Sequence, residues 1–114
     1  MKYLMLVISE PVAQPVAGED DVEPWVEEHD ASGARFFGDR LADVSQSKTV
    51  RIRREGTMVT DGPFAEGHEH IAGLDILECD SIDEAVQVAL GHPMARHGAL
   101  EVRPFYDWDA EEGS

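Results

Sequence analysis

Residues 71–93 read IAGLDILECDSIDEAVQVALGHP and hold the clearest secondary-structure signals of the chain. The first nine, Ile71 to Cys79, are mostly apolar and predict a strand. Ser81 and Glu84 form a capping box, a pairing that satisfies free backbone N–H groups at the start of a helix. An apolar stripe at helical spacing follows, and Gly91 ends it. The stretch therefore predicts one strand joined to one helix.

Four further strands are indicated by other apolar patterns. Lys2 to Ser9 is apolar at both alternating sets of positions, which is typical of a central strand covered on both faces. Lys48 to Arg54 alternates apolar with polar residues, and Glu55–Gly56 then makes a tight hairpin into Thr57–Thr60. Leu100 to Tyr106 is the last strand.

Another helix is predicted between Asp21, its expected cap, and Gly33, its expected stop. Trp25 and His29 fall on one stripe at helical spacing, so we expect both to face inward. The following segment, residues 34–47, is interpreted as irregular or as a short additional helix.

The predicted order is strand, helix, paired strands, helix, strand. Right-handed crossovers then place both main helices on one face of a mostly antiparallel sheet, the split arrangement of ferredoxin-like α+β domains. Residues 1–108 are interpreted as a single domain, residues 109–114 as an acidic tail, and residues 10–20 as either a flap or a plain connector. The other face of the sheet is partly apolar, and we expect a second copy to cover it in a homodimer.

The composition argues against several classes of partner. Twenty-four acidic and 9 basic residues give a formal charge of −15, which repels nucleic acids and anionic lipids. Cys79 is the only cysteine, so no internal disulfide can form, and a reducing cytoplasm is the expected compartment. The apolar stretch from Tyr3 to Ile8 is too short for a signal peptide or a membrane span. We therefore expect no nucleic-acid and no membrane partner.

Residues 60–70 read TDGPFAEGHEH and concentrate acids, bases and a rigid turn. Gly62 and Pro63 force a sharp bend that holds the Asp61 carboxylate at the end of a strand. Asp61 has two interpretations, because an Asp before Gly-Pro commonly stabilises the turn itself and can also serve in catalysis.

The same run also contains residue types that bind metals. Glu66, His68 and His70 alternate, so an extended backbone would point them the same way. Short runs of this kind are more often solvated than metal-bound, and no metal site is predicted.

Several segments resemble the YCII-related, or DGPF-domain, family. The likeness rests on TDGPFAE at 60–66, AG at 72–73, SIDEA at 81–85 and GALEVRP at 98–104, and it extends over residues 2–108. The resemblance implies a dimeric α+β barrel built from ferredoxin-like protomers.

The resemblance also bears on the site. Members of the wider group are associated with a His and Asp pair in a cavity, and some eliminate chloride from chlorinated hydroxyquinones. His29 is the candidate for that histidine, and Asp61 is the acid nearest the shared turn. More typical members have Asp-Pro after the second helix, where this chain has His92-Pro93, and residues 36–53 make a longer segment.

The candidate catalytic residues are thus His29 and Asp61. An unperturbed imidazole pKa of about 6.5 suits proton transfer at neutral pH, although a buried histidine is usually a packed core residue. Arg51 either pairs with a carboxylate or orients an anionic substrate. The candidate substrate-binding residues are Arg51, Phe64, His92 and His97.

Two functions remain open at this stage. The sequence holds no nucleophile elbow, phosphate-binding glycine loop, dinucleotide fingerprint or paired-cysteine zinc pattern, so we expect no cofactor. One possibility is a cofactor-independent acid–base enzyme, of lyase, isomerase or dehydrochlorinase type, acting on a small organic molecule. The alternative is a non-catalytic dimeric module that binds a ligand or a protein in a regulatory context.

Overall fold

A computed structural model describes residues 1–63 and 69–112 of the chain. Its main sheet is antiparallel and has the strand order β2-β5-β1-β6. The four strands are β1 (Lys2–Ser9), β2 (Arg35–Arg40), β5 (His70–Glu78) and β6 (Ala99–Pro104). This order and direction are those of a ferredoxin-like α+β domain, so the predicted fold class is confirmed.

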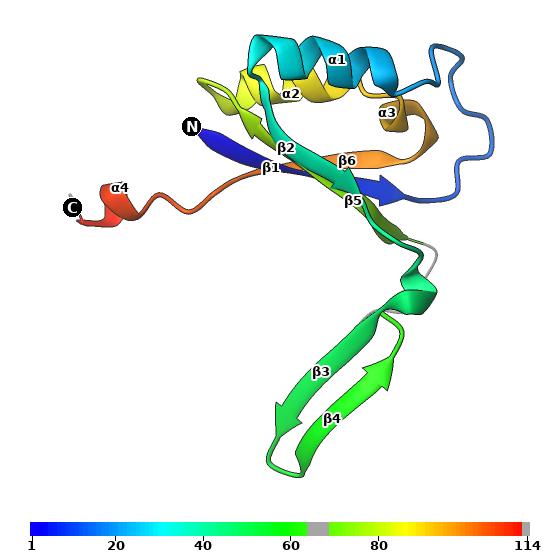
Figure 1. Ribbon diagram of the computed structural model, residues 1–114, viewed down its shortest axis with the longest axis vertical. Coiled ribbons are helices and arrows are strands. Elements are labelled where there is room, and N and C mark those ends of the chain that lie inside the picture. The colour runs from blue at the N-terminus through cyan, green and yellow to red at the C-terminus, as the bar shows by residue number, and fades with distance from the viewer. Residues whose placement is uncertain (64–68, 113–114) are drawn as a thin grey trace.

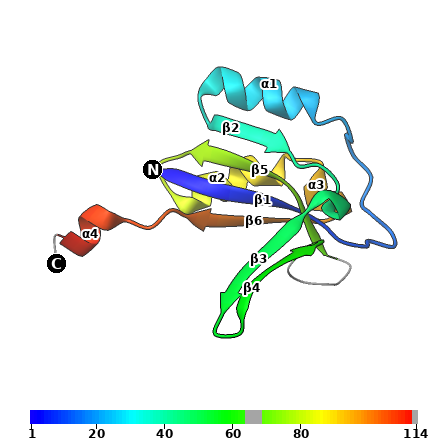
Figure 2. The same ribbon diagram turned by 60° about the horizontal axis from the view of Figure 1, so that its bottom comes forward.

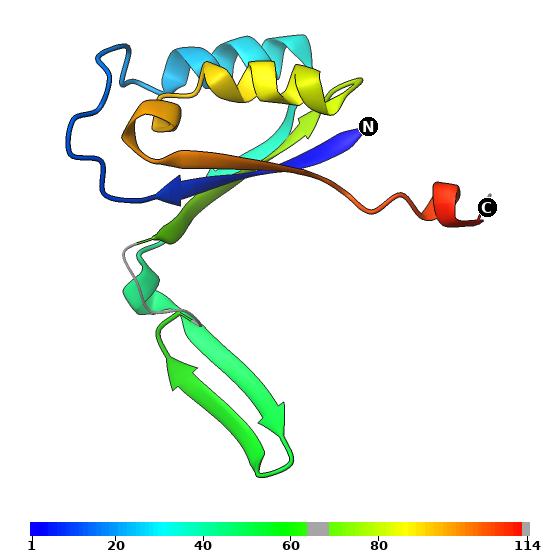
Figure 3. The same ribbon diagram turned by 180° about the vertical axis from the view of Figure 1, so that it is seen from behind.

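Helices cover one face of this sheet, as Figures 1 and 3 show. They are α1 (Glu23–Ser32), α2 (Ile82–Leu90) and the short α3 (Met94–His97). Trp25 of α1 is 5% exposed, and its Nε1–H donates to the Val88 carbonyl oxygen at 2.9 Å, which ties α1 to α2. The buried core consists of Tyr3, Met5, Val7, Trp25, Leu77, Cys79, Ala85, Val88 and Ala89.

The predicted ends at Ser81, Gly91 and Gly33 are confirmed, whereas the cap expected at Asp21 is corrected. The N-cap of α1 is Val22, and Asp21 accepts the Glu23 N–H at 3.0 Å from one position further out. The Glu84 N–H donates to Ser81 Oγ at 3.1 Å, and Glu84 Oε2 in turn accepts from the Asp80 N–H at 3.0 Å. The other main helix, α1, ends at Gly33, whose φ of 83° lies in the left-handed region that glycine adopts without strain.

The interpretation of residues 34–47 was wrong. They contain the edge strand β2, paired with β5, followed by the 3-10 turn η1 (Val44–Gln46). The register of β2 shifts between Arg35 and Phe37, and Phe36 and Phe37 both remain more than half exposed. A bulge of this kind breaks the two-residue alternation by which a strand is recognised from sequence.

The predicted hairpin forms, but it does not belong to the main sheet. Strands β3 (Lys48–Arg53) and β4 (Gly56–Asp61) pair with each other in a separate two-stranded sheet. The hairpin projects away from the rest of the molecule in Figures 1 and 2, and we call residues 48–61 the arm. Its base is closed by a hydrogen bond of 2.8 Å from the Gly62 N–H to the Ser47 carbonyl oxygen.

The two faces of β1 have different surroundings. Tyr3, Met5 and Val7 are buried beneath the helices. Leu4 and Leu6 point to the opposite face, which no element of the described residues covers. The prediction that both faces of this strand are covered is therefore met on one side only within a single chain.

The C-terminal segment forms the short helix α4 (Trp108–Glu112), which the sequence analysis did not predict. Asp107 supports its start by accepting the Ala110 N–H at 3.1 Å. In the described part of the chain, every helix is too short or too polar to cross a membrane.

Candidate functional site

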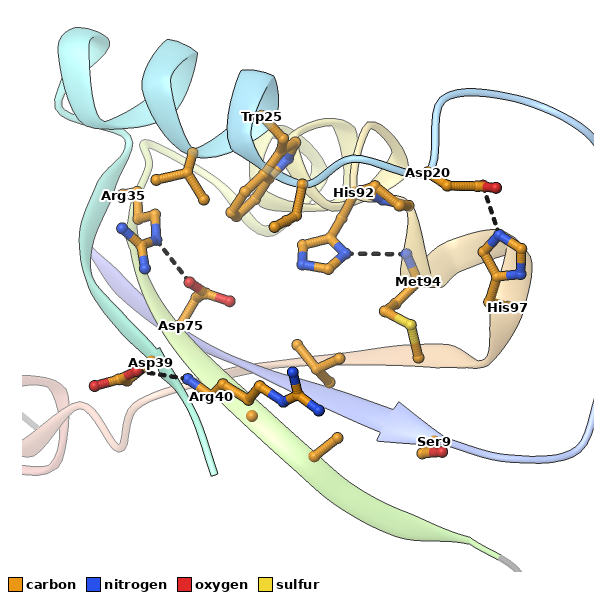
Figure 4. Close-up of a pocket in the computed structure, with 16 residues that line it drawn as sticks. Ser9, Asp20, Trp25, Arg35, Asp39, Arg40, Asp75, His92, Met94 and His97 are labelled. Atoms are coloured by element: carbon orange, nitrogen blue, oxygen red, sulfur yellow. Dashed lines mark hydrogen bonds and ion pairs between the residues drawn. The ribbon is translucent and has the colours of Figure 1, made fainter. Parts of the chain in front are cut away.

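A cavity of about 460 Å³ lies between the helix-covered face of the sheet, α1 and α3. We call it the helix–sheet cavity, and Figure 4 shows its lining. Its size lies within the range of small-molecule sites. Its polar lining comes from Ser9, Asp20, Arg35, Asp39, Arg40, Asp75, His92 and His97.

A buried ion pair forms one wall. Arg35 of β2 donates from Nε to Asp75 Oδ1 at 2.7 Å, and Asp75 is only 6% exposed. The same guanidinium also pairs with Asp30 at the end of α1, at 3.0 Å. Because a buried carboxylate needs such a partner, Arg35 keeps Asp75 in place beside the cavity.

Gly38 makes room for this ion pair. It lies opposite Asp75 in the β2–β5 register, and a Cβ atom built there would fall 1.9 Å from Asp75 Oδ1 and 2.6 Å from Arg35 Nη2. Any larger residue at this position must displace the pair.

His92, between α2 and α3, is buried against the opposite side of the cavity and is 7% exposed. Its Nδ1 accepts the Met94 N–H at 3.0 Å, and its ring packs edge-on against Trp25 with centroids 4.8 Å apart. An accepting Nδ1 places the proton of a neutral imidazole on Nε2. His92 is therefore held as a hydrogen-bond donor.

Burial also sets the charge of His92. It lowers the pKa of the ring below its ordinary value, against the opposing effect of the Asp75 charge, and the charge of Arg35 lowers it further. The ring is thus neutral at neutral pH. Figure 4 shows the Asp75 carboxylate and the His92 ring turned toward the same space.

The loop over residues 10–20 is anchored at the mouth of the cavity. Asp20 Oδ1 accepts from His97 Nε2 at 2.7 Å and from Arg96 Nη1 at 3.1 Å. The hydrogen bond from His97 is the main reason that the pKa of Asp20 is lowered, and the bond from Arg96 lowers it further. Arg96 also donates to the carbonyl oxygens of Val16 and Glu19. These contacts hold the loop beside the cavity, and its role as a flap or a plain connector stays a prediction.

Arg40, at the end of β2, supplies a cation along the sheet side of the cavity, as Figure 4 shows. Among the described residues its guanidinium has no ion-pair partner. In a chain of charge −15, this is a local positive charge at which an anion can bind.

His29, the predicted base, does not line the helix–sheet cavity. It lies 15% exposed in a second hollow of about 360 Å³ between α1 and α2, with its ring 5.0 Å from that of Trp25. Glu28 Oε2 lies 4.0 Å from its Nε2.

Asp61 is the last residue of β4 and lies at the base of the arm. Its side chain is 82% exposed and pairs with Lys48 across the hairpin. Within one chain Asp61 and His29 therefore lie in different surroundings, and their catalytic roles stay predictions. The physical reason is that β4 belongs to the separate hairpin, so its end does not reach the first helix.

The predicted substrate-binding residues fall in different places. His92 and His97 line the helix–sheet cavity, whereas Arg51 lies on the arm. Phe64 lies outside the described residues, as do Glu66 and His68.

Sequence reasoning missed Arg35, Arg40, Asp75 and Asp20 as site residues. Asp75 carried a usable signal, because a carboxylate in the middle of an apolar strand needs a buried partner. Its partner Arg35 lies 40 residues away on a strand that was not predicted. Within residues 1–63 and 69–112, no group of three or more His, Cys, Asp or Glu side chains is arranged to hold a metal ion.

Fold and cavity together define a ferredoxin-like α+β domain with a polar site between helices and sheet. A family model for the YCII-related domain matches residues 1–109, and the chain belongs to this family. An uncharacterised protein of Rhizobium meliloti (strain 1021) is 39% identical over 67 residues, which cover 57% of this chain and 54% of that relative. The alignment thus spans about half the length of each protein.

Proposed function

We propose that the protein is a cofactor-independent acid–base enzyme for a small oxo acid that can enolise, bound in the helix–sheet cavity. The observation that carries the proposal is the convergence of a buried carboxylate, Asp75, and a buried neutral imidazole, His92, on one cavity. A buried group that can accept a proton and a buried group that can donate a hydrogen bond, both beside one cavity, are typical of acid–base sites.

The two groups have complementary roles in the proposed reaction. Asp75 takes the proton from the carbon next to the carbonyl, through the carboxylate oxygen that Arg35 Nε leaves available. His92 donates its Nε2–H to the carbonyl oxygen and stabilises the negative charge that develops there. Return of the proton from Asp75 to carbon completes the cycle, and no oxidant or cofactor takes part.

The cation at the cavity suggests the substrate class. Arg40 is placed to pair with a carboxylate of the substrate, while Trp25 and Val26 supply apolar contacts. The loop anchored by Asp20 would limit the entry of water.

Proton abstraction can be tested without knowing the physiological product. A panel of 2-oxo acids is incubated with the protein in D₂O, and deuterium uptake at the adjacent carbon is followed by ¹H NMR. We expect catalysed uptake for at least one of them, reduced about 10²-fold or more in Asp75→Asn.

Matched variants separate this site from the one expected from sequence. Asp61→Asn makes the same chemical change on the arm, and His29→Gln matches His92→Gln. Loss of uptake in Asp61→Asn and His29→Gln, with Asp75→Asn and His92→Gln unaffected, would assign catalysis to the pair predicted from the sequence. Binding of an oxo acid without any uptake would favour the ligand-binding module instead.

A further inference from the structure

On the helix-covered face of the sheet, two charged side chains each lie beside a glycine. The strand register aligns the residues of this face in rows that run across β2, β5 and β1. From β2 to β1, one row consists of Gly38, Asp75 and Met5, and the next consists of Arg40, Gly73 and Val7. Glycine weakens the interior of a strand, so each of these two glycines needs a physical reason.

The reason differs between the two positions. At Gly38 the space that a side chain would fill is taken by the Asp75 carboxylate. At Gly73 the three atoms nearest to an added Cβ all belong to the backbone of β2, the closest being the Asp39 carbonyl oxygen at 3.0 Å. Because β2 is an edge strand, it can move by the few tenths of an ångström that this contact requires. The approach of β2 therefore does not by itself require a glycine at position 73.

The space over Gly73 belongs to the helix–sheet cavity. Gly73 lines this cavity, and so do Arg40 and Val7, its partners on the two adjacent strands. The missing side chain leaves the floor of the cavity at the level of the β5 backbone between these two partners. A glycine inside a strand often marks a place where a ligand approaches the backbone closely. We call this part of the cavity the Gly73 subsite.

The surroundings of the Gly73 subsite favour a carboxylate. Arg40 supplies a positive charge on one side, and Val7 supplies an apolar contact on the other. The next residue of β5 on this face is Asp75, about 7 Å farther along the strand. The Asp75 carboxylate is already paired with Arg35. A short acid whose carboxylate is held at Arg40 therefore directs its adjacent carbon atoms toward Asp75.

We infer that Gly73 is a specificity-determining residue of the helix–sheet cavity, because its missing side chain forms the subsite for the substrate carboxylate. A side chain at this position would compete with that carboxylate for the space beside Arg40. The inference rests on the proposed function for the choice of an oxo acid as ligand. It adds a residue that contributes space and no functional group.

Gly73→Ala tests the subsite by adding one methyl group to the floor of the cavity. Binding of 2-oxobutanoate to the ¹⁵N-labelled protein is measured from the amide chemical shifts. We expect the dissociation constant to rise about tenfold or more, which is the effect of one additional methylene-sized group in a fitted pocket. Gly91→Ala adds the same group to the second hollow and should change the constant by less than about twofold.

Two further measurements distinguish a blocked subsite from a damaged fold. Val7→Ile narrows the subsite from β1, which is separated from β2 by β5, so it should also weaken binding without displacing β2. Deuterium uptake at saturating 2-oxobutanoate should fall by less than about twofold in Gly73→Ala, because Gly73 carries no group that moves a proton. The Michaelis constant for uptake should rise together with the dissociation constant.

The outcomes separate this inference from the proposed reaction. Equal dissociation constants for Gly73→Ala and the unmodified protein, or equal increases in Gly73→Ala and Gly91→Ala, would overturn the inference. Unchanged binding in Val7→Ile would also contradict it. Weaker binding in Gly73→Ala and Val7→Ile, with no deuterium uptake even in the unmodified protein, would support the Gly73 subsite and overturn the proposed reaction alone.

Discussion

The helix-covered side of the sheet and the arm place their polar and apolar groups in opposite ways. Beneath the helices, Asp75 and His92 are buried and each has a defined hydrogen-bond partner. On the arm, Val50 and Ile52 are exposed, whereas the ionic groups Lys48 and Asp61 pair in water. Buried polar groups with partners are costly to arrange and indicate a site, while exposed apolar groups indicate an unfilled contact. The difference separates a buried polar site from an exposed apolar surface.

The largest expected effect concerns packing. Trp25→Ala should lower the free energy of unfolding by about 3–5 kcal/mol, because it removes a large buried side chain and its hydrogen bond to Val88. Urea denaturation at low protein concentration measures this. Ile52→Ala, on the exposed arm, should change the value by less than about 0.5 kcal/mol under the same conditions. Equal losses would show that the arm is packed within its own chain.

Ion pairs should show the same contrast on a smaller scale. Arg35→Met leaves Asp75 buried without its main partner and should cost about 3 kcal/mol. Lys48→Met removes an exposed pair with Asp61 and should cost less than about 1 kcal/mol. Chemical denaturation at pH 7 compares the two variants. A larger loss for Lys48→Met would contradict the assignment of the buried pair as the structural one.

Gly38→Ala tests the space reserved for that pair. The added methyl group would overlap Asp75 Oδ1, so we expect a loss of about 1–3 kcal/mol. The double variant Gly38→Ala with Asp75→Ala should lose less than the sum of the two single variants, since the overlap is then relieved. Strict additivity would argue against the close approach.

A graded pH effect is expected from His92. Because burial lowers its pKa in the folded state, the unfolded chain binds the proton more readily. This contribution to stability is fully present above the unfolded-state pKa of about 6.5 and is lost as the pH falls toward the folded-state value. Thermal unfolding between pH 7.5 and 5 should show a smaller decline in His92→Gln than in the unmodified protein. Identical declines would place the pH dependence elsewhere.

The parts of the fold that depend on residues close together in the sequence were predictable. Ser81 with Glu84 and Gly33 fix helix ends through contacts within a few residues, and both ends were predicted correctly. The hairpin was also recognised, but alternation along a strand does not say which sheet it joins. Strand β2 was missed because its bulge breaks the alternation.

The site was less predictable because it depends on distant pairs. His92 and His97 were proposed, yet their role depends on Asp75 and Asp20, which reach them only through the fold. Asp61 was predicted as a site residue because it lies in a run rich in acidic and histidine residues. Asp61 is the last residue of the arm, whereas the carboxylate that lines the cavity, Asp75, lies in the apolar strand β5.

Binding of small molecules on the helix-covered side of the sheet is best tested by locating a bound oxo acid. Titration of the ¹⁵N-labelled protein with 2-oxobutanoate should shift the amide signals of Gly73, Asp75, Met94 and His97, while signals of residues 48–61 stay in place. Shifts confined to the arm, or to His29 and Gln87 in the second hollow, would show that the helix–sheet cavity is not the binding site.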